Sequence, residues 1–241
     1  MRTWAFLLLV VVFASAYTDQ SFSAAVRVTA DGDAHVIEKS VFYLDSEEES
    51  KAFNYLLSQG ETTLADWQKF SGNVRYHFLG PLNNLNIIAA REYSVGSNAA
   101  SISLEYDAQQ LFLSRQLGVR TTRYELDRSR LDLAAGKPGE FSLGNSMELE
   151  MILPEDAVNI AVNPEPGVAR EEYNKLSWTG PITGKWEVSF EREKPLSQEV
   201  TEFFSRLYSD LTESYAVLLI ILFAALVLFK LIRYLRPATC L

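Results

Sequence analysis

Histidines and closely spaced acidic residues are the side chains in this sequence that could supply general acids, general bases and metal ligands. The two histidines, His35 and His77, lie in separate segments with strand-like patterns. Neither has a neighbouring pattern of metal ligands, so both are predicted to be structural. The only cysteine, Cys240, excludes both a disulfide framework and a cysteine-based zinc site.

Two glycine-containing segments resemble ion-binding or phosphate-binding loops. Asp31 and Asp33 flank Gly32, and carboxylates on a turn suit calcium, but the further oxygen ligands of a calcium site are missing. The segment 180–185 has three residues between its glycines instead of four, and Trp186 stands where a phosphate loop has serine or threonine. We therefore predict two turns, and neither a cofactor nor a metal.

Acidic pairs leave a hydrolase open as an alternative. The chain has 31 aspartates and glutamates, among them the neighbours Glu155 and Asp156. A glycosidase needs two carboxylates about 5–10 Å apart, a separation that a sequence does not give. No nucleophile elbow or H-E-x-x-H motif is present. No residue is therefore assigned as catalytic, and an anchored hydrolase acting on envelope polymers stays an alternative.

The composition is that of a folded, acidic protein. Of 241 residues, 48% are hydrophobic and 22% are charged, which argues against intrinsic disorder. The formal net charge is −9, which disfavours binding to nucleic acid, because that needs basic patches that face phosphates. We therefore predict that nucleic acid is not a partner.

The first sixteen residues have the pattern of a secretory signal peptide. Arg2 precedes an apolar run of ten residues, 4–13, which is too short to span a bilayer. Ala14 and Ala16 then form an A-x-A cleavage site, so cleavage is predicted after Ala16. The following segment, 17–196, has no cysteine and no glycosylation sequon, which favours a prokaryotic envelope over a eukaryotic cell surface.

A second apolar run, at 214–232, is predicted to be a transmembrane helix. Acidic residues precede it, and Lys230, Arg233 and Arg236 lie at its end and in the short basic tail 233–241. Because positive charge favours the cytoplasmic side, these three residues set the predicted orientation. The chain is then a single-pass type I protein with the lipid bilayer as a partner and its C-terminus in the cytoplasm.

Alternation of apolar and polar residues dominates segment 17–196. Strands with one wet face are predicted around 102–106, 147–153, 158–162 and 186–190, with weaker ones at 22–30, 35–44, 85–93 and 119–126. One-sided strands favour an antiparallel, sandwich-like sheet domain. A small helical insert at about 46–70 is predicted from the capping box formed by Ser46 and Glu49. The predicted fold is therefore mainly β with a helical insert.

Segment 197–213 is predicted to be an amphipathic juxtamembrane helix that runs on into the apolar run as one long helix. Its apolar residues recur at helical spacing and form one stripe, a candidate contact surface made of Val200, Phe203, Phe204, Leu207, Tyr208 and Leu211. Three alternatives stay open for what packs against the stripe: the chain's own β-domain, a second copy or partner subunit, or the membrane surface.

The segments 153–157, 163–166 and 176–181, followed by the helix and the apolar run, resemble uncharacterised archaeal and bacterial envelope proteins. The resemblance covers about residues 140–236 and is one of architecture: a secreted β-domain of unknown function on a single C-terminal anchor. It implies no activity and transfers no site residue.

The leading hypothesis is a non-enzymatic β-domain outside the cytoplasm. It would act in recognition, or as an accessory or structural subunit of an envelope complex, with another membrane or envelope protein or a second copy as its partner. A homo-oligomeric surface spacer is a further alternative beside the hydrolase.

Overall fold

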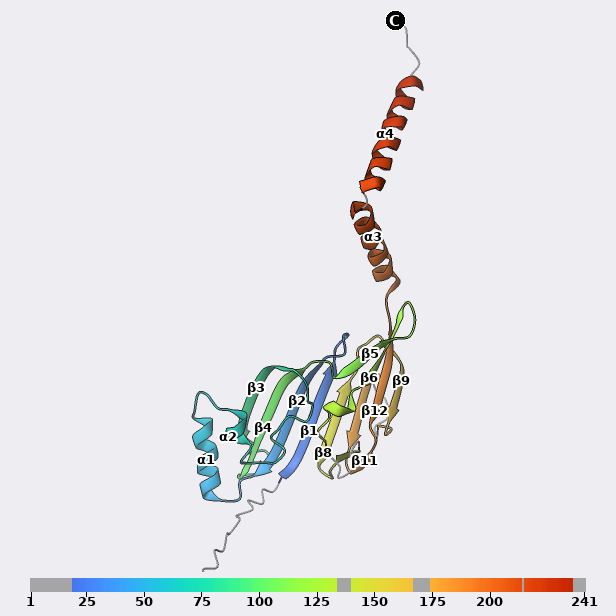
Figure 1. The fold of residues 1–241 in the computed structure, drawn as a ribbon. Coiled ribbons are helices and arrows are strands. Elements are labelled where there is room, and N and C mark those ends of the chain that lie inside the picture. Colours follow the sequence, from blue (N-terminus) through green and yellow to red (C-terminus); the bar gives the residue numbers. More distant parts are fainter. Residues whose placement is uncertain (1–18, 134–139, 167–173, 214, 236–241) are drawn as a thin grey trace, which may run out of the picture. The chain divides into compact units, whose positions relative to one another are not determined.

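The computed structural model describes residues 19–133, 140–166, 174–213 and 215–235 (Figure 1). Contacts divide the chain into two units, Met1–Arg192 and Glu193–Leu241, and each is described by itself. The predicted signal peptide with Ala14 and Ala16 lies outside the described residues, as do Arg236 and Cys240.

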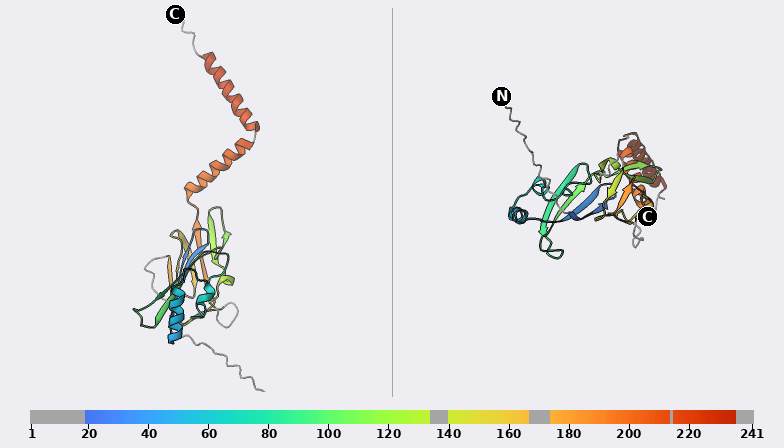
Figure 2. Two further views of the ribbon diagram at one scale, coloured as in Figure 1. Left: turned by 90° about the vertical axis from the view of Figure 1, so that its left-hand side faces the viewer. Right: turned by 90° about the horizontal axis from the view of Figure 1, so that it is seen from below.

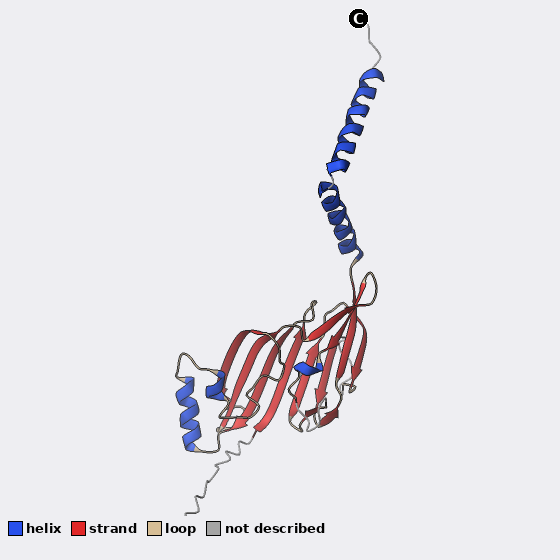
Figure 3. Ribbon diagram, viewed as in Figure 1, coloured by secondary structure: helices blue, strands red, loops and turns tan. Residues whose placement is uncertain are grey.

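The described part of the first unit is built mainly of strands (Figure 3). Its strands are β1 (Asp19–Val28), β2 (Ala34–Tyr43), β3 (Leu82–Arg91), β4 (Ala99–Ala108), β5 (Phe112–Gln116), β6 (Thr121–Leu126), β7 (Phe141–Leu143), β8 (Met147–Ile152), β9 (Ala157–Asn163), β10 (Lys175–Thr179), β11 (Ile182–Gly184) and β12 (Glu187–Glu193). Its helical segments are α1 (Glu47–Leu57), α2 (Leu64–Trp67) and the short η1 (Arg128–Arg130). The mainly β prediction and the helical insert at about 46–70 are therefore confirmed.

The strands form a six-stranded sheet in the order β10-β8-β1-β2-β4-β3, a four-stranded sheet in the order β5-β6-β12-β9, and the pair β11-β7. The prediction of an antiparallel domain is wrong at one place, because β1 and β8 pair in parallel. Parallel neighbours need a long connection, and β2 to β7 lie between these two strands in the sequence. Alternation shows which residues share a face, but it does not show which strands are neighbours.

One face of the six-stranded sheet is buried and the other is wet. On β1, Phe22, Ala24, Val26 and Val28 are buried, whereas the residues between them are exposed. We call the buried side the inner face and the wet side the outer face. Because successive side chains on a strand point to opposite faces, the predicted alternation is confirmed for this strand.

The helical insert covers part of the inner face. Phe53 of α1 packs edge-on against Phe42 of β2, with ring centroids 6.1 Å apart, and against Trp67 of α2 at 5.3 Å. Two capping boxes start the helices: Ser46 Oγ accepts from Glu49 N–H, and the Asp66 carboxylate accepts from the Thr63 N–H. The insert lies at the β3–β4 end of the sheet (Figures 1 and 2).

The four-stranded sheet shares the same core. Trp178 of β10 meets Trp186, just before β12, with ring centroids 4.9 Å apart, and both side chains are fully buried. This confirms that these tryptophans pack in the core. Val158 was predicted to be buried but is exposed, because a register shift and the positive φ of Asn159 bend β9 at that point.

The second unit contains α3 (Leu196–Glu213) and α4 (Tyr215–Leu235). The prediction of a transmembrane helix at 214–232 is wrong: among the described residues no helix is long and apolar enough to cross a membrane. The sequence holds sixteen uncharged residues between Glu213 and Lys230, and a helix of that length extends over about 24 Å against a hydrocarbon core of about 30 Å. The orientation deduced from Lys230, Arg233 and Arg236 depended on that span and has no support without it.

In place of the predicted single long helix, the structure has two helices, α3 and α4. Residue 214 between them lies outside the described residues. The fold class is therefore corrected to a mainly β unit with a small helical insert, followed by two C-terminal helices whose described residues contain no membrane span.

A substitution at Gly180 measures how tightly the loop between β10 and β11 is packed. A Cβ at this position would overlap the backbone carbonyl of Gly144 and lie 2.8 Å from that of Leu143. Because these are backbone atoms, we expect Gly180→Ala to lower the free energy of unfolding by about 1–3 kcal/mol. Gly184→Ala is the matched control, since its Cβ meets nothing within 4 Å. Urea unfolding followed by tryptophan fluorescence compares the two, and equal losses would contradict the packing argument.

Candidate functional site

A polar cluster lies buried under the inner face of the six-stranded sheet. Its members are Glu38 of β2, Tyr106 of β4 and His77, and each side chain is at most 2% exposed. Glu38 Oε1 accepts from the Tyr106 hydroxyl at 2.5 Å and from the His77 backbone N–H at 3.0 Å. Glu38 Oε2 lies 3.0 Å from His77 Nδ1. The cluster therefore joins two strands to the segment that follows the helical insert.

Burial first, and the neighbouring Glu38 carboxylate second, raise the pKa of the Tyr106 hydroxyl far above its ordinary range. The hydroxyl thus stays protonated and donates to Glu38 while it accepts from the Phe78 N–H at 3.3 Å. A carboxylate beside an imidazole is a pairing that bases in enzymes use. Here all three side chains are sealed from solvent, and the hydrogen bonds of Glu38 join β2 to β4 and to the His77 segment.

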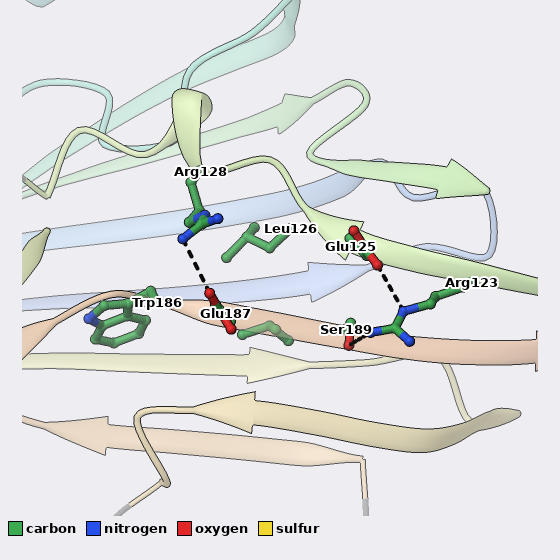
Figure 4. A pocket seen from close by; sticks show the side chains of 8 residues that line it. Arg123, Glu125, Leu126, Arg128, Trp186, Glu187 and Ser189 are labelled. Carbon is green, nitrogen blue, oxygen red and sulfur yellow. Dashed lines mark hydrogen bonds and ion pairs between the residues drawn. The ribbon is translucent and has the colours of Figure 1, made fainter. Parts of the chain in front are cut away.

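A shallow hollow lies between β6 and β12 (Figure 4). Its volume is about 220 Å³, below the range of about 300–1,000 Å³ typical of ligand pockets. The residues that line it are Arg123, Glu125, Leu126, Arg128, Trp186, Glu187, Val188 and Ser189.

The charges of the hollow pair with one another. Arg128 Nη1 lies 3.3 Å from Glu187 Oε1, and Arg123 Nε lies 2.8 Å from Glu125 Oε1. These side chains are substantially exposed, so each pair contributes little to stability. Trp186 Nε1 is buried and has no hydrogen-bond partner among the described residues. Both arginines that line the hollow thus already have a carboxylate partner.

On the outer face, His35 bridges two carboxylates of β4. His35 Nδ1 lies 2.8 Å from Asp107 Oδ1, and His35 Nε2 lies 3.3 Å from Glu105 Oε1. The hydrogen bond with His35, followed by that from Asn84, holds the pKa of Asp107 below its ordinary range. The general acid of a hydrolase that uses two carboxylates needs a raised pKa, so Asp107 does not fit that role. Within the described ranges, no group of three or more potential ligands is placed to hold a metal ion.

The predicted contact stripe lies on α3. Five of its side chains are described, and all are exposed, from 43% for Leu207 to 71% for Tyr208. With 3.6 residues per turn, the positions from 200 to 211 share an arc of about 140°. The side chain of Leu211 lies outside the described residues, and so does that of Arg233, whereas Lys230 is exposed on α4. The structure thus brings the described stripe residues onto one helix face.

Neither the Glu38 cluster nor the hollow was predicted from the sequence. Glu38 shares its strand parity with Val36 and Phe42, but Ile37 and Val41 occupy the other parity, so alternation alone did not show that Glu38 is buried. The hollow depends on how β6 and β12 meet, and no sequence spacing encodes that.

No family model matches the sequence, and no curated protein matches it. Among solved structures, the chain is similar to the folded domain of the Mycobacterium tuberculosis LppM protein, determined by NMR. The identity is 8%, the TM-score is 0.33, and the match covers 72% of this chain and 88% of that one. A likeness this low carries no argument about what the chain does.

Tyr106→Phe tests the buried cluster. The variant removes one donor to Glu38 and one acceptor for Phe78, so we expect a loss of about 1–3 kcal/mol in the free energy of unfolding. The pKa of Tyr106 is raised in the folded state, so the folded chain holds this proton more tightly than the unfolded chain. The resulting stability is complete below the ordinary pKa of 10.0 and is lost as pH rises above it.

Wild type should therefore lose stability more steeply than Tyr106→Phe above about pH 10. Urea unfolding at pH 8, 10 and 11 measures this difference in slope. Parallel curves for the two proteins would show that Tyr106 is not held protonated by the fold.

Proposed function

We propose that this protein is a non-enzymatic subunit of an envelope complex, in which the β-rich unit is the recognition or structural part and α3 makes the assembly contact. The observation that carries the proposal is the exposed apolar stripe of α3. Its position outside the cytoplasm rests on the predicted signal peptide of residues 1–16.

The stripe is large enough to drive association. Four of its described side chains are Phe203, Phe204, Leu207 and Tyr208, which are between 43% and 71% exposed. Fully burying one large apolar side chain contributes roughly 1.5–3 kcal/mol, so a partner that covered these residues would offset much of the entropic cost of binding. Aromatic residues are also enriched among those that dominate protein interfaces.

The charges of α3 favour a protein partner over a lipid surface. The helix carries four acidic residues, Glu199, Glu202, Asp210 and Glu213, and one basic residue, Arg206. Helices that lie on membranes place lysine and arginine on the polar face, because anionic lipids attract them. An acidic polar face is repelled by such lipids, so we assign the stripe to a contact with protein.

The β-rich unit supports a binding role better than a catalytic one. Its buried polar cluster is closed to solvent, the charges of its hollow are paired, and the Asp107 carboxyl beside His35 has a lowered pKa. On its outer sheet face, Ser103, Glu105 and Asp107 of β4 are polar and partly exposed, as expected of a unit that presents a surface rather than a cleft.

The assembly role is tested by replacing Phe203, Phe204 and Leu207 with serine in the full-length protein. We expect the assembled mass in light scattering to fall, because the apolar contact is lost, while the β-rich unit stays folded. Tryptophan fluorescence reports on that unit alone, since the described tryptophans are Trp67, Trp178 and Trp186 and α3 contains none.

The matched control is Glu199→Ser with Glu202→Ser, which changes α3 away from the stripe and should leave the mass unchanged. If the serine variant of the stripe instead lowered the unfolding temperature reported by the tryptophans, the stripe would belong to the core of the β-rich unit and the proposal would fail.

A further inference from the structure

We propose that the hairpin formed by β5 and β6 binds the surface of an anionic phospholipid bilayer. Its turn, residues 117–120, is called the hairpin tip below. The tip would insert Leu117 and Val119 among the lipid headgroups, while Arg115 beside it would contact a lipid phosphate. This surface is separate from the stripe of α3, so the inference goes beyond the proposed function and does not depend on it.

The hairpin exposes aliphatic side chains at a place where turns are ordinarily polar. Residues 113–119 are all exposed, and the turn projects from the edge of the four-stranded sheet (Figure 1). Val119 is 80% exposed, and Leu113 and Leu117 are about half exposed. A hydrogen bond of 3.0 Å from the Leu117 N–H to the Thr121 carbonyl closes the turn. Three aliphatic side chains within seven residues thus face solvent together.

The hairpin is basic although the chain is acidic. The segment 112–124 contains three arginines, Arg115, Arg120 and Arg123, and no acidic residue, whereas the whole chain has a formal net charge of −9. Arginine and lysine near a membrane surface are attracted by the phosphates of anionic lipids. The positive charge is therefore concentrated beside the exposed aliphatic side chains.

Two of these arginines face each other across the hairpin. Arg115 and Arg123 are directly opposite in the register of β5 and β6, so their side chains share a face. Like charges in this position destabilise a strand pair. Arg123 Nε lies 2.8 Å from Glu125 Oε1, whereas Arg115 has no ion pair within the described residues. An anion from outside the chain would offset the repulsion, and Arg115 is the group placed to receive it.

A bilayer satisfies the apolar and the basic side chains at the same place. A soluble phosphate would use Arg115 but would leave Leu117 and Val119 in water. Lipid headgroups place phosphates directly above the acyl region, so guanidinium groups and aliphatic side chains are both accommodated. A protein partner would need an acidic hollow shaped to receive a projecting turn, whereas a bilayer deforms around one.

A fluorescent label on the hairpin tip tests the proposal in the full-length protein. In a Cys240→Ser background, Val119→Cys carries the environment-sensitive dye NBD. Ile88→Cys on β3 is the matched control, because Ile88 is also exposed, at 52%, and lies in the other sheet. With phosphatidylglycerol vesicles, we expect the dye at position 119 to brighten and shift to the blue, while the dye at position 88 stays unchanged.

The role of charge is measured on the same labelled protein. Phosphatidylcholine vesicles should bind the tip at least about tenfold more weakly than phosphatidylglycerol vesicles. Arg115→Gln should weaken binding to phosphatidylglycerol about fivefold, because one cation near the anionic surface is lost. Arg27→Gln on β1 removes the same charge from another exposed position and should change the affinity less than about twofold.

Several results would overturn the proposal. These are a dye at position 119 that does not respond to phosphatidylglycerol, an equal response at position 88, and equal binding to the two lipids. A shift that needs no vesicles and grows with protein concentration would assign the tip to a contact between copies. The same shift with sodium phosphate alone would assign Arg115 to a free anion. None of these results changes the light-scattering test of α3, so the two proposals fail separately.

Discussion

The buried carboxylate of Glu38 is the constraint on which the arrangement of the β-rich unit depends. Its oxygens are satisfied by His77 and Tyr106, which lie 39 and 68 residues away in the sequence. A buried carboxylate that loses a partner costs several kcal/mol, so these contacts hold β4 in register beside β2 and hold the segment after the helical insert against the inner face. The insert is thereby tied to the sheet at its far end as well as by its aromatic packing.

This arrangement determines which polar groups of the described unit reach solvent. The inner face of the six-stranded sheet is covered by the insert and by side chains from the four-stranded sheet, which together form one core. The polar groups that resemble catalytic ones fall into two sets. Those around Glu38 are buried, and those around His35 and in the hollow form ion pairs with neighbouring side chains. The stripe on α3, by contrast, is a set of apolar side chains that are exposed on one face of an amphipathic helix.

Local patterns predicted much of this structure. The alternation of β1, β4, β8 and β12 and the capping box at Ser46 are local properties, so they were readable from neighbouring residues alone. The parallel pairing of β1 with β8 could not be predicted in this way. Period-two alternation shows which residues share a face of a strand, but it does not show which strand lies beside it. On β2, both parities contain apolar residues, so the sequence did not show whether the face with Glu38 or the face with Ile37 is buried.

The C-terminal helices show the same limit of local patterns: helical spacing predicts an apolar surface, but it does not predict what binds to that surface. Helical spacing predicted the stripe, and the structure places its described residues on one exposed helix face. The amount of apolar surface, however, is compatible with a lipid, a foreign protein or a second copy. The acidic residues of α3 disfavour an anionic lipid surface, because such lipids attract lysine and arginine. Helical spacing identifies which residues share a face, whereas the identity of the partner depends on a second surface that the pattern of this chain does not encode.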